Sequence, residues 1–299
     1  MNVGFIGLGI MGRPMAANLL HNGISLLVHD LQQEAVDALT AQGAVQASPA
    51  EIGQQCDLVF TILPRGDIVQ DVLFGADGVA KGLRPGSLVV DMSSVTPIES
   101  RLCYDKLSAM GIGFLDAPVS GGEPGAIAGT LSFMIGGEQS NFDRAYPYLM
   151  HMGASAVLVG SSGSGSVTKL ANQIIVNLGI AAVSEALVLA VKAGVDPQKV
   201  YEAIRGGLAG SAVLDAKAPM MYHRNFKPGG RISINHKDIK NVVATAEQLD
   251  IPLPLTNQLY SIMQALMDRG LAGCDHSAIV QYFEMRANVT VKSNLPESD

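Results

Sequence analysis

The stretch that decides the fold is NVGFIGLGIMGRPMAANLL, residues 2–20. Its apolar start, residues 2–6, predicts a buried strand, and the spacing of Met11, Met15 and Leu19 predicts a helix. Between them stands the glycine pattern GxGxxG, which binds a dinucleotide diphosphate when a strand precedes it and a helix follows. We therefore predict that this turn binds a dinucleotide cofactor through Gly7, Leu8, Gly9, Ile10, Met11 and Gly12.

The three glycines have separate expected tasks. Gly7 permits a tight turn, Gly9 lets the diphosphate approach the backbone, and Gly12 lets the helix pack closely on the sheet. The N-terminus of the helix adds amide donors and partial positive charge. The alternative is a glycine-rich turn without a ligand.

Asp30 ends the second expected strand, where a carboxylate can accept hydrogen bonds from the adenosine ribose of a bound cofactor. Taken alone, it is equally compatible with a turn-forming aspartate. No Arg or Lys follows in residues 31–33 to balance a 2′-phosphate, which the carboxylate itself repels. We therefore predict a preference for NAD(H) over NADP(H).

Strands and helices alternate through the first half of the chain. This alternation predicts an α/β domain of Rossmann type over residues 1–162, in which helices cover both faces of a doubly wound parallel sheet. The expected strands are 25–29, 58–63, 88–91, 114–117, 131–135 and 156–159, and the expected helices are 32–41, 67–73, 97–109 and 142–150.

The second half of the chain predicts helices only. Nothing breaks a helix between Val167 and about Gly194, so a long interdomain helix begins an all-α domain over residues 163–292. The polar tail, residues 293–299, is expected to be disordered. Further helices are expected at 197–204, 211–216, 237–248, 255–267 and 277–287.

Charge, hydropathy and the spacing of cysteine and histidine argue against several classes of function. The 299 residues carry a net charge of −7, which argues against binding of nucleic acid, because that needs a dense basic face. The apolar run 170–191 contains Asn172, Gln173, Asn177 and Glu185, so we expect a buried helix and no membrane span. Three scattered cysteines favour the cytoplasm, and scattered histidines predict no metal site.

Lys169 stands near the start of the long helix, on one face with Asn172 and Gln173. An ammonium beside apolar surface has a lowered pKa and can donate a proton near neutral pH, although such a lysine can also simply extend to water. The segment Ser120-Gly121-Gly122 follows an expected strand and offers a hydroxyl and two amides to a carboxylate; the alternative is an ordinary loop.

These motifs together resemble the β-hydroxyacid dehydrogenase family over residues 3–287. Four segments match in order: GFIGLGIMGRPMAANL (4–19), DAPVSGG (116–122), GSVTKLANQ (165–173) and KDI (237–239). Residues 203–219 and 225–229 are similar to members that reduce tartronate semialdehyde, so the resemblance implies NADH-dependent reduction of this aldehyde to D-glycerate.

The resemblance also implies residue roles. Lys169 is the implied catalytic acid and base. The implied substrate ligands are Ser120, Gly121, Gly122, Asn172 and Asp238, and the further implied cofactor contacts are Leu63, Pro64, Ser94 and Lys237.

Two positions depart from the family pattern. Relatives commonly carry an aromatic residue where this chain has Gly230, and His236 is not expected in close reductases. A missing ring predicts extra space and acceptance of a substrate longer than three carbons.

Several alternatives stay open. The substrate is a small carboxylate, and 3-hydroxyisobutyrate, 4-hydroxybutyrate or a four-carbon sugar acid are alternatives to tartronate semialdehyde. A non-catalytic dinucleotide-binding module and a structural protein built on the long helix are rivals from other classes. The length and apolar character of that helix predict a homodimer or homotetramer.

Overall fold

The computed structural model describes residues 2–295. They form two compact units, residues 1–169 and 170–299, that divide within helix α8 (Ser164–Lys192). The predicted boundary at 162/163 lies just before this helix. Of the tail expected to be disordered, residues 296–299 lie outside the described part. Ser293, in contrast, is buried and its hydroxyl donates a hydrogen bond to Asp196.

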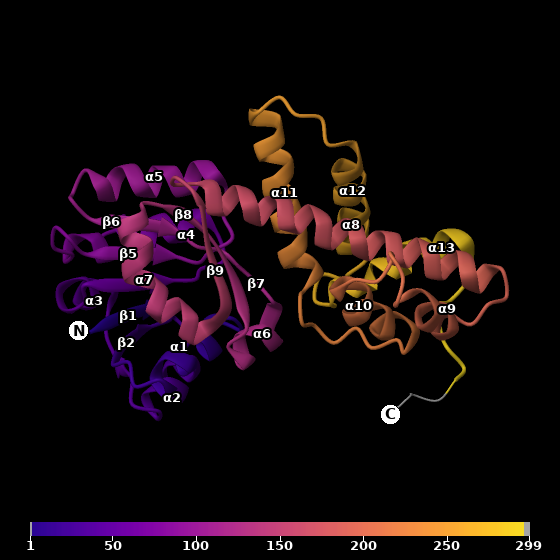
Figure 1. The fold of residues 1–299 in the computed structure, drawn as a ribbon, viewed down its shortest axis with the longest axis horizontal. Coiled ribbons are helices and arrows are strands. Elements are labelled where there is room, and N and C mark those ends of the chain that lie inside the picture. Colours follow the sequence, from indigo (N-terminus) through magenta and orange to yellow (C-terminus); the bar gives the residue numbers. More distant parts are fainter. Residues whose placement is uncertain (1, 296–299) are drawn as a thin grey trace. The chain divides into compact units, whose positions relative to one another are not determined.

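The first unit is built on one nine-stranded sheet with the order β3-β2-β1-β4-β5-β6-β8-β7, in which β9 pairs with β8 (Figure 1). The strands β1 to β6 are parallel, as predicted. The sheet then departs from the expected parallel pattern, because β8 runs antiparallel to β6 and β7. The strands are β1 (Val3–Ile6), β2 (Leu26–His29), β3 (Val45–Gln46), β4 (Leu58–Thr61), β5 (Leu88–Asp91), β6 (Gly113–Asp116), β7 (Val119–Ser120), β8 (Leu131–Gly137) and β9 (Gly153–Gly160).

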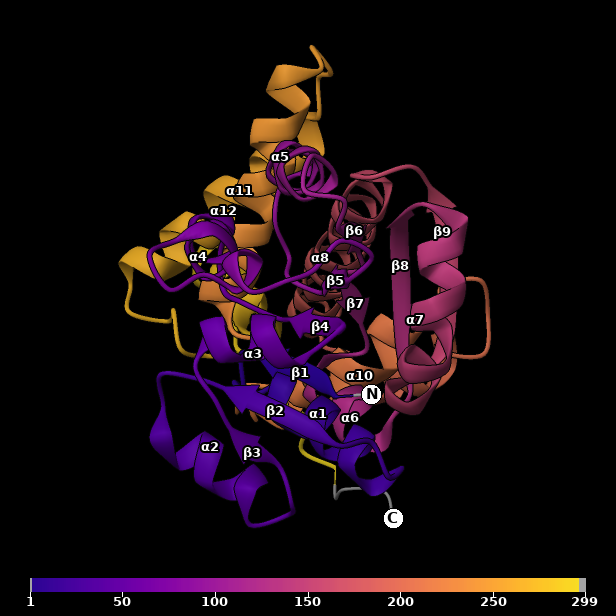
Figure 2. The ribbon, with the colours of Figure 1, turned by 90° about the vertical axis from the view of Figure 1, so that its left-hand side faces the viewer.

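Helices cover both faces of this sheet (Figure 2), and the strands β1, β4 and β5 are therefore buried on both sides. Residues that alternate along β1 and β4 point to opposite faces: Phe5 and Phe60 pack under α1, α2 and α7, whereas Val59 packs under α3, α4 and α5. The helices are α1 (Gly12–His21), α2 (Gln33–Thr40), α3 (Pro49–Gln55), α4 (Gly66–Phe74), α5 (Pro97–Ser108), α6 (Gly122–Ala128) and α7 (Gln139–Met152), with a 3₁₀ turn η1 (Val79–Lys81).

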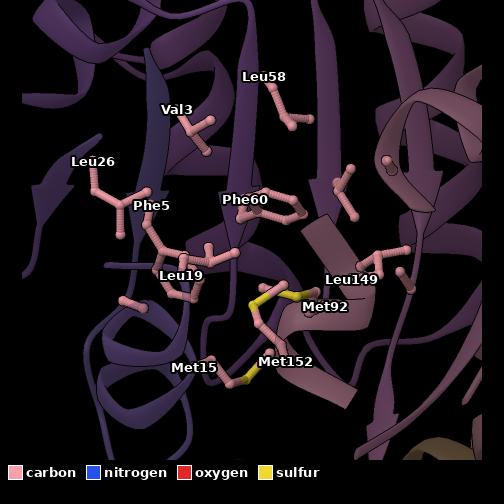
Figure 3. Close-up of a cluster of buried hydrophobic side chains, with 14 of the residues drawn as sticks. Val3, Phe5, Met15, Leu19, Leu26, Leu58, Phe60, Met92, Leu149 and Met152 are labelled. Atoms are coloured by element: carbon pink, nitrogen blue, oxygen red, sulfur yellow. The ribbon is translucent and has the colours of Figure 1, made fainter. Parts of the chain in front are cut away.

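The core on the α1 side is centred on two aromatic rings (Figure 3). Phe5 and Phe60 stand on neighbouring strands with ring centroids 6.1 Å apart, and Leu19 of α1 and Leu149 of α7 point toward them. All four side chains are at most 1% exposed. This packing holds α1, and with it the glycine turn, against the carboxyl ends of β1 and β4.

Residues 45–55 were not predicted to contain β3 and α3. The strand β3 has only two residues, too few for a period-2 pattern. Helix α3 does carry a start signal: the N-cap Ser48 and Glu51 in the first turn form a capping box, as Thr96 and Glu99 do at the start of α5. A capping search would have found it where hydrophobic periodicity did not.

The second unit is all-α, as predicted. Helix α8 is long and apolar enough to cross a membrane by length and composition, a test that core helices of globular proteins also pass. Its buried Ile180 and Leu187 belong to one hydrophobic core cluster that includes residues from every other helix of the unit. The other elements are α9 (Pro197–Ile204), α10 (Ala212–Tyr222), α11 (Ile232–Gln248), α12 (Pro254–Asp268), η2 (His276–Ile279) and α13 (Val280–Ala287), of which α11 and α12 form an antiparallel pair (Figure 1).

Candidate active site

The glycine turn has the geometry that dinucleotide binding requires. Gly7 has φ +97°, and an added Cβ there would overlap the carbonyl oxygen of Ile62. A Cβ on Gly12 would overlap the carbonyl oxygen of Gly7, so the close helix packing also needs glycine. At Gly9, in contrast, no described atom lies within 4 Å of the Cβ position, which leaves room for a ligand.

The N-terminus of α1 fits the same ligand. Its N-cap residue Met11 makes no side-chain capping hydrogen bond, so the partial positive charge at this end of the helix is available to a ligand beside Gly9. Ile10 is 41% exposed at this end, and Met11 is the N-cap residue. The residues present therefore fit a dinucleotide diphosphate.

Asp30 fastens the glycine turn to the end of β2. Its Oδ2 accepts a hydrogen bond from the Leu8 amide at 2.5 Å, and its Oδ1 accepts one from the Gln32 amide at 2.8 Å. Because β1 and β2 are neighbours, the carboxylate lies beside the predicted diphosphate position. Its contact with a ribose stays a prediction.

Leu63 and Pro64 follow β4, the strand on the other side of β1. The Leu63 amide donates to the Ser93 hydroxyl at 2.8 Å, and that hydroxyl donates to Asp91 Oδ1 at 2.5 Å. This chain of hydrogen bonds links the ends of β4 and β5, from which the half-buried Ser94 also follows.

Asp91 is a residue that the motif search missed. It is 1% exposed and also accepts a hydrogen bond from the Thr61 hydroxyl at 2.8 Å. Burial raises the pKa of Asp91 to about 6, although the hydrogen bonds from Ser93 and Thr61 act in the opposite direction. The available signal was a charged residue at the end of the apolar run Leu88-Val-Val-Asp91.

Lys169 meets the predicted carboxylate-binding loop. Its amine donates a hydrogen bond to the carbonyl oxygen of Val119 at 2.7 Å. Val119 and Ser120 form β7, and the two glycines that follow have φ +135° and +62°. Gly121 and Gly122 are exposed, so their backbone is accessible. Lys169 and the Ser120–Gly122 loop, predicted from separate motifs, are thus brought together within the first unit.

Asp116, the first residue of the DAPVSGG segment, is a second buried carboxylate, and the sequence pattern predicts no role for it. It ends β6 and is 1% exposed. Its Oδ1 accepts from the Gly163 amide at 2.7 Å and its Oδ2 from the Ser166 amide at 2.8 Å. Burial raises the pKa of Asp116, and the hydrogen bonds from these amides lower it.

The helical unit holds a connected group of polar side chains. The Gln173 amide donates to Asp238 Oδ2 at 2.7 Å and to Asn235 Oδ1 at 3.2 Å, and its carbonyl oxygen accepts from Asn172 at 3.0 Å. Lys237 pairs with the other oxygen of Asp238 at 3.0 Å. The predicted ligands Asn172, Lys237 and Asp238 therefore belong to one network, and Gln173 is its centre.

Gly230 has polar neighbours in the helical unit, and acceptance of a substrate longer than three carbons stays a prediction. A Cβ on Gly230 would lie 3.3 Å from His276 Nε2 and 3.4 Å from Asn235 Nδ2, so polar side chains already fill the direction in which a ring would start. His236 is half-buried and stacks on Tyr260 at 4.7 Å between ring centroids. Burial lowers the pKa of His236.

Comparisons with known proteins agree with this geometry. Residues 2–160 match the model of the NAD-binding domain of 6-phosphogluconate dehydrogenase, and residues 163–283 match that of NADP-dependent 3-hydroxyisobutyrate dehydrogenase. The chain is 43% identical to the 2-hydroxy-3-oxopropionate reductase of Escherichia coli K12, over 96% of this chain and 99% of that protein. It is 36% identical to the 2-(hydroxymethyl)glutarate dehydrogenase of Eubacterium barkeri, over 97% of each.

A solved structure gives the same result for the fold. The 3-hydroxyisobutyrate dehydrogenase of Mycobacterium tuberculosis, solved with L-serine, superposes with a TM-score of 0.87 at 30% identity, covering 94% of this chain and 98% of that one. The relatives are named for different substrates but for one kind of chemistry, oxidation and reduction at a CH–OH group. The chain belongs to the β-hydroxyacid dehydrogenase family and is an NAD(P)-dependent oxidoreductase.

Proposed function

We propose that this enzyme reduces tartronate semialdehyde (2-hydroxy-3-oxopropanoate) to D-glycerate with NADH. The substrate is supported by the 43% identity to a protein named for that reaction. The single structural observation that carries the proposal is the hydrogen bond from Lys169 to Val119, because it holds an amine at the start of a loop suited to a carboxylate.

Lys169 is the proposed general acid. The nicotinamide cofactor, when bound, supplies hydride to the aldehyde carbon. The aldehyde oxygen then gains negative charge, and an ammonium within hydrogen-bond reach stabilises it and donates the proton. In the direction of oxidation the neutral amine accepts the same proton. A positioned acid of this kind contributes about 10²- to 10⁴-fold in rate.

Ser120, Gly121 and Gly122 are the proposed carboxylate ligands, together with Asn172, one turn after Lys169 on α8. A hydroxyl and consecutive backbone amides bind an anion without adding a cation that would compete with the lysine. Holding the carboxylate fixes the aldehyde group, which one carbon separates from it, so that the aldehyde oxygen meets the ammonium. Orientation of this kind is a large part of what such a site supplies.

The proposed cofactor preference is NADH over NADPH, and it rests on Asp30. This carboxylate already stabilises the turn through the Leu8 amide, and a 2′-phosphate beside it would meet a like charge. We expect kcat/KM to favour NADH; a ratio that favours NADPH would overturn the preference without affecting the reaction class.

The test of the substrate is oxidation of NADH against a panel of short semialdehyde acids of three to five carbons. We expect the highest kcat/KM for tartronate semialdehyde. A higher value for the semialdehyde of 3-hydroxyisobutyrate, of 4-hydroxybutyrate or of a four-carbon sugar acid would replace it. No turnover of any member would leave a dinucleotide-binding protein.

A homodimer or homotetramer is also proposed, because α8 carries apolar side chains at the surface: Ile175 and Leu189 are each 72% exposed. Light scattering checks it, and a monomer of 31.3 kDa would contradict it. The three free thiols support a cytoplasmic location.

A further inference from the structure

We infer that Asp116 is a positioning residue for Lys169: it fixes the first turn of α8 to the strand end from which the Ser120–Gly122 loop departs. This inference rests on the proposed role of Lys169 as proton donor and deepens it. All residues concerned lie within the first compact unit.

The two oxygens of Asp116 hold α8 at two points. Oδ1 accepts from the Gly163 amide, immediately before the helix, and Oδ2 accepts from the Ser166 amide in its first turn. The first amides of a helix lack partners within the helix, and a carboxylate both satisfies them and stabilises the positive end of the helix dipole. Lys169 follows Ser166 by three residues, so its backbone is placed by this same turn.

Close backbone contacts leave the turn little freedom to move. A Cβ on Gly165 would overlap the carbonyl oxygens of Asp116 and Met134, and a Cβ on Gly136 would lie 2.6 Å from Asp116 Oδ1. Helix and sheet therefore meet backbone to backbone around the carboxylate. The Ser100 and Ser166 hydroxyls, 2.8 Å apart, form a hydrogen bond beside this turn that involves side chains only and no backbone atom.

The same residue also begins the proposed substrate loop. Asp116 is the last residue of β6, and the chain continues directly through Val119 to the two exposed glycines. The loop is therefore held to the sheet by the backbone of Asp116, and the lysine by its side chain. The distance between proton donor and substrate loop depends on one residue, which explains a buried carboxylate at this position.

The test is a double-mutant cycle between Asp116→Asn and Lys169→Ala, with the single variants measured at saturating NADH. Asparagine can accept one amide but turns an N–H toward the other, so the turn must shift. Because a displacement of about 1 Å costs up to about 10²-fold, we expect kcat to fall roughly 10- to 100-fold with the Kd for NADH unchanged. In the Lys169→Ala background, with activity restored by added alkylamine, Asp116→Asn should cost less than about twofold.

The outcomes of the cycle distinguish the positioning role of Asp116 from the catalytic role of Lys169. An equal loss in both backgrounds would mean a general structural role and would overturn the inference, while the role of Lys169 would stand. Full activity of Lys169→Ala alone would overturn the proposed function first. The pH profile of kcat should keep its midpoint; a displacement of about one unit or more would mean that the charge of Asp116 acts on the lysine directly.

Two further variants guard against a misfolded Asp116→Asn protein. Ser100→Ala removes a buried hydrogen bond at the same turn without moving backbone, so it should lower stability by a small amount and leave kcat within about twofold. Gly165→Ala keeps the carboxylate but forces the turn away from the sheet. It should reproduce the loss of kcat, again only when Lys169 is present, and unchanged kcat in a folded Gly165→Ala protein would contradict the inference.

Discussion

Two neighbouring strands of the α/β unit end in buried aspartates that hold different parts of the site. Asp91 of β5 and Asp116 of β6 are partners in the sheet register, and both are 1% exposed. Asp91 accepts two hydroxyls and holds the amide of Leu63 through Ser93. Asp116 instead accepts two amides at the start of α8. The same residue type at the same sheet edge thus serves the predicted cofactor loop in one case and the proposed proton donor in the other.

The role of a carboxylate at a strand end therefore depends on which segment of the chain donates hydrogen bonds to it. Burial raises the pKa of both groups, which means that the charged form of each carboxylate is less favourable in the protein interior than in water. Hydrogen bonds offset this cost of burial, and through them each carboxylate holds a segment that lies far away in the sequence. If this comparison is correct, substitutions at the two aspartates should affect different kinetic constants.

Removal of Lys169, the residue that Asp116 is inferred to position, should have the strongest effect on turnover. Lys169→Ala should lower kcat by about 10²- to 10⁴-fold, because the developing oxyanion loses its acid, while fluorescence titration shows NADH binding unchanged. Lys192→Ala is the matched control on the same helix, since that exposed amine donates to the Ala287 carbonyl, outside the proposed site, and should leave kcat intact. Near-normal turnover of Lys169→Ala would remove the lysine from the chemistry.

The next effect tests the Asp91 side through pH. The pKa of Asp91 is about 6 in the folded protein against an ordinary 3.8, so the folded state binds more protons between these values. The stability from the protonated form is complete below about pH 3.8 and is lost as pH rises through 6. We expect the wild type to lose up to about 3 kcal/mol relative to Asp91→Asn over this range, measured by urea unfolding.

Asp105→Asn, an exposed change on α5, serves as the control for that titration. It should follow the wild type at every pH. A constant difference in unfolding free energy between wild type and Asp91→Asn from pH 4 to 7 would show that Asp91 does not titrate in this range.

A smaller effect separates the two carboxylates by kinetics. Asp91→Asn should raise the Kd for NADH by about tenfold, the loss of one charge-assisted hydrogen bond, and leave kcat at saturating NADH within a few-fold. Ser93→Ala should do the same, because it removes the direct acceptor of the Leu63 amide. A fall in kcat with unchanged Kd would make Asp91 resemble Asp116 and would end the distinction.

A substitution at Thr61 should affect NADH binding least. Thr61→Val removes one hydrogen bond to the carboxylate but leaves the link through Ser93 to Leu63. We expect the pKa of Asp91 to rise further, as a displaced titration in unfolding curves, and the Kd for NADH to stay within about threefold. An effect on Kd as large as that of Ser93→Ala would mean that burial of the charge, and not the link, matters.

Signals between residues close in the sequence were enough to predict many of the helices and strands. Residues 2–20 contain both the hydrophobic periodicity and the glycines of a strand, turn and helix, and the structure confirms each element. Helix α9 begins at Pro197 and ends at Ile204 as predicted, because Asp196 caps it and a proline starts it. Segments without such signals were missed: β3 and β7 have two residues each, and α6 has seven with three glycines or prolines among its first four.

Periodicity and turn chemistry act between residues a few positions apart, so the amino-acid order alone was enough to identify the α/β and all-α halves, the dinucleotide turn and the lysine segment. The reversal of β8 depended on pairings between distant segments. So did the tasks of Asp91 and Asp116. The hydrogen bonds of Asp116 join residues 47 and 50 positions apart, and no local pattern reports them. A buried carboxylate is stable only where folding brings donors to it, and those donors are chosen by the packing of the whole unit.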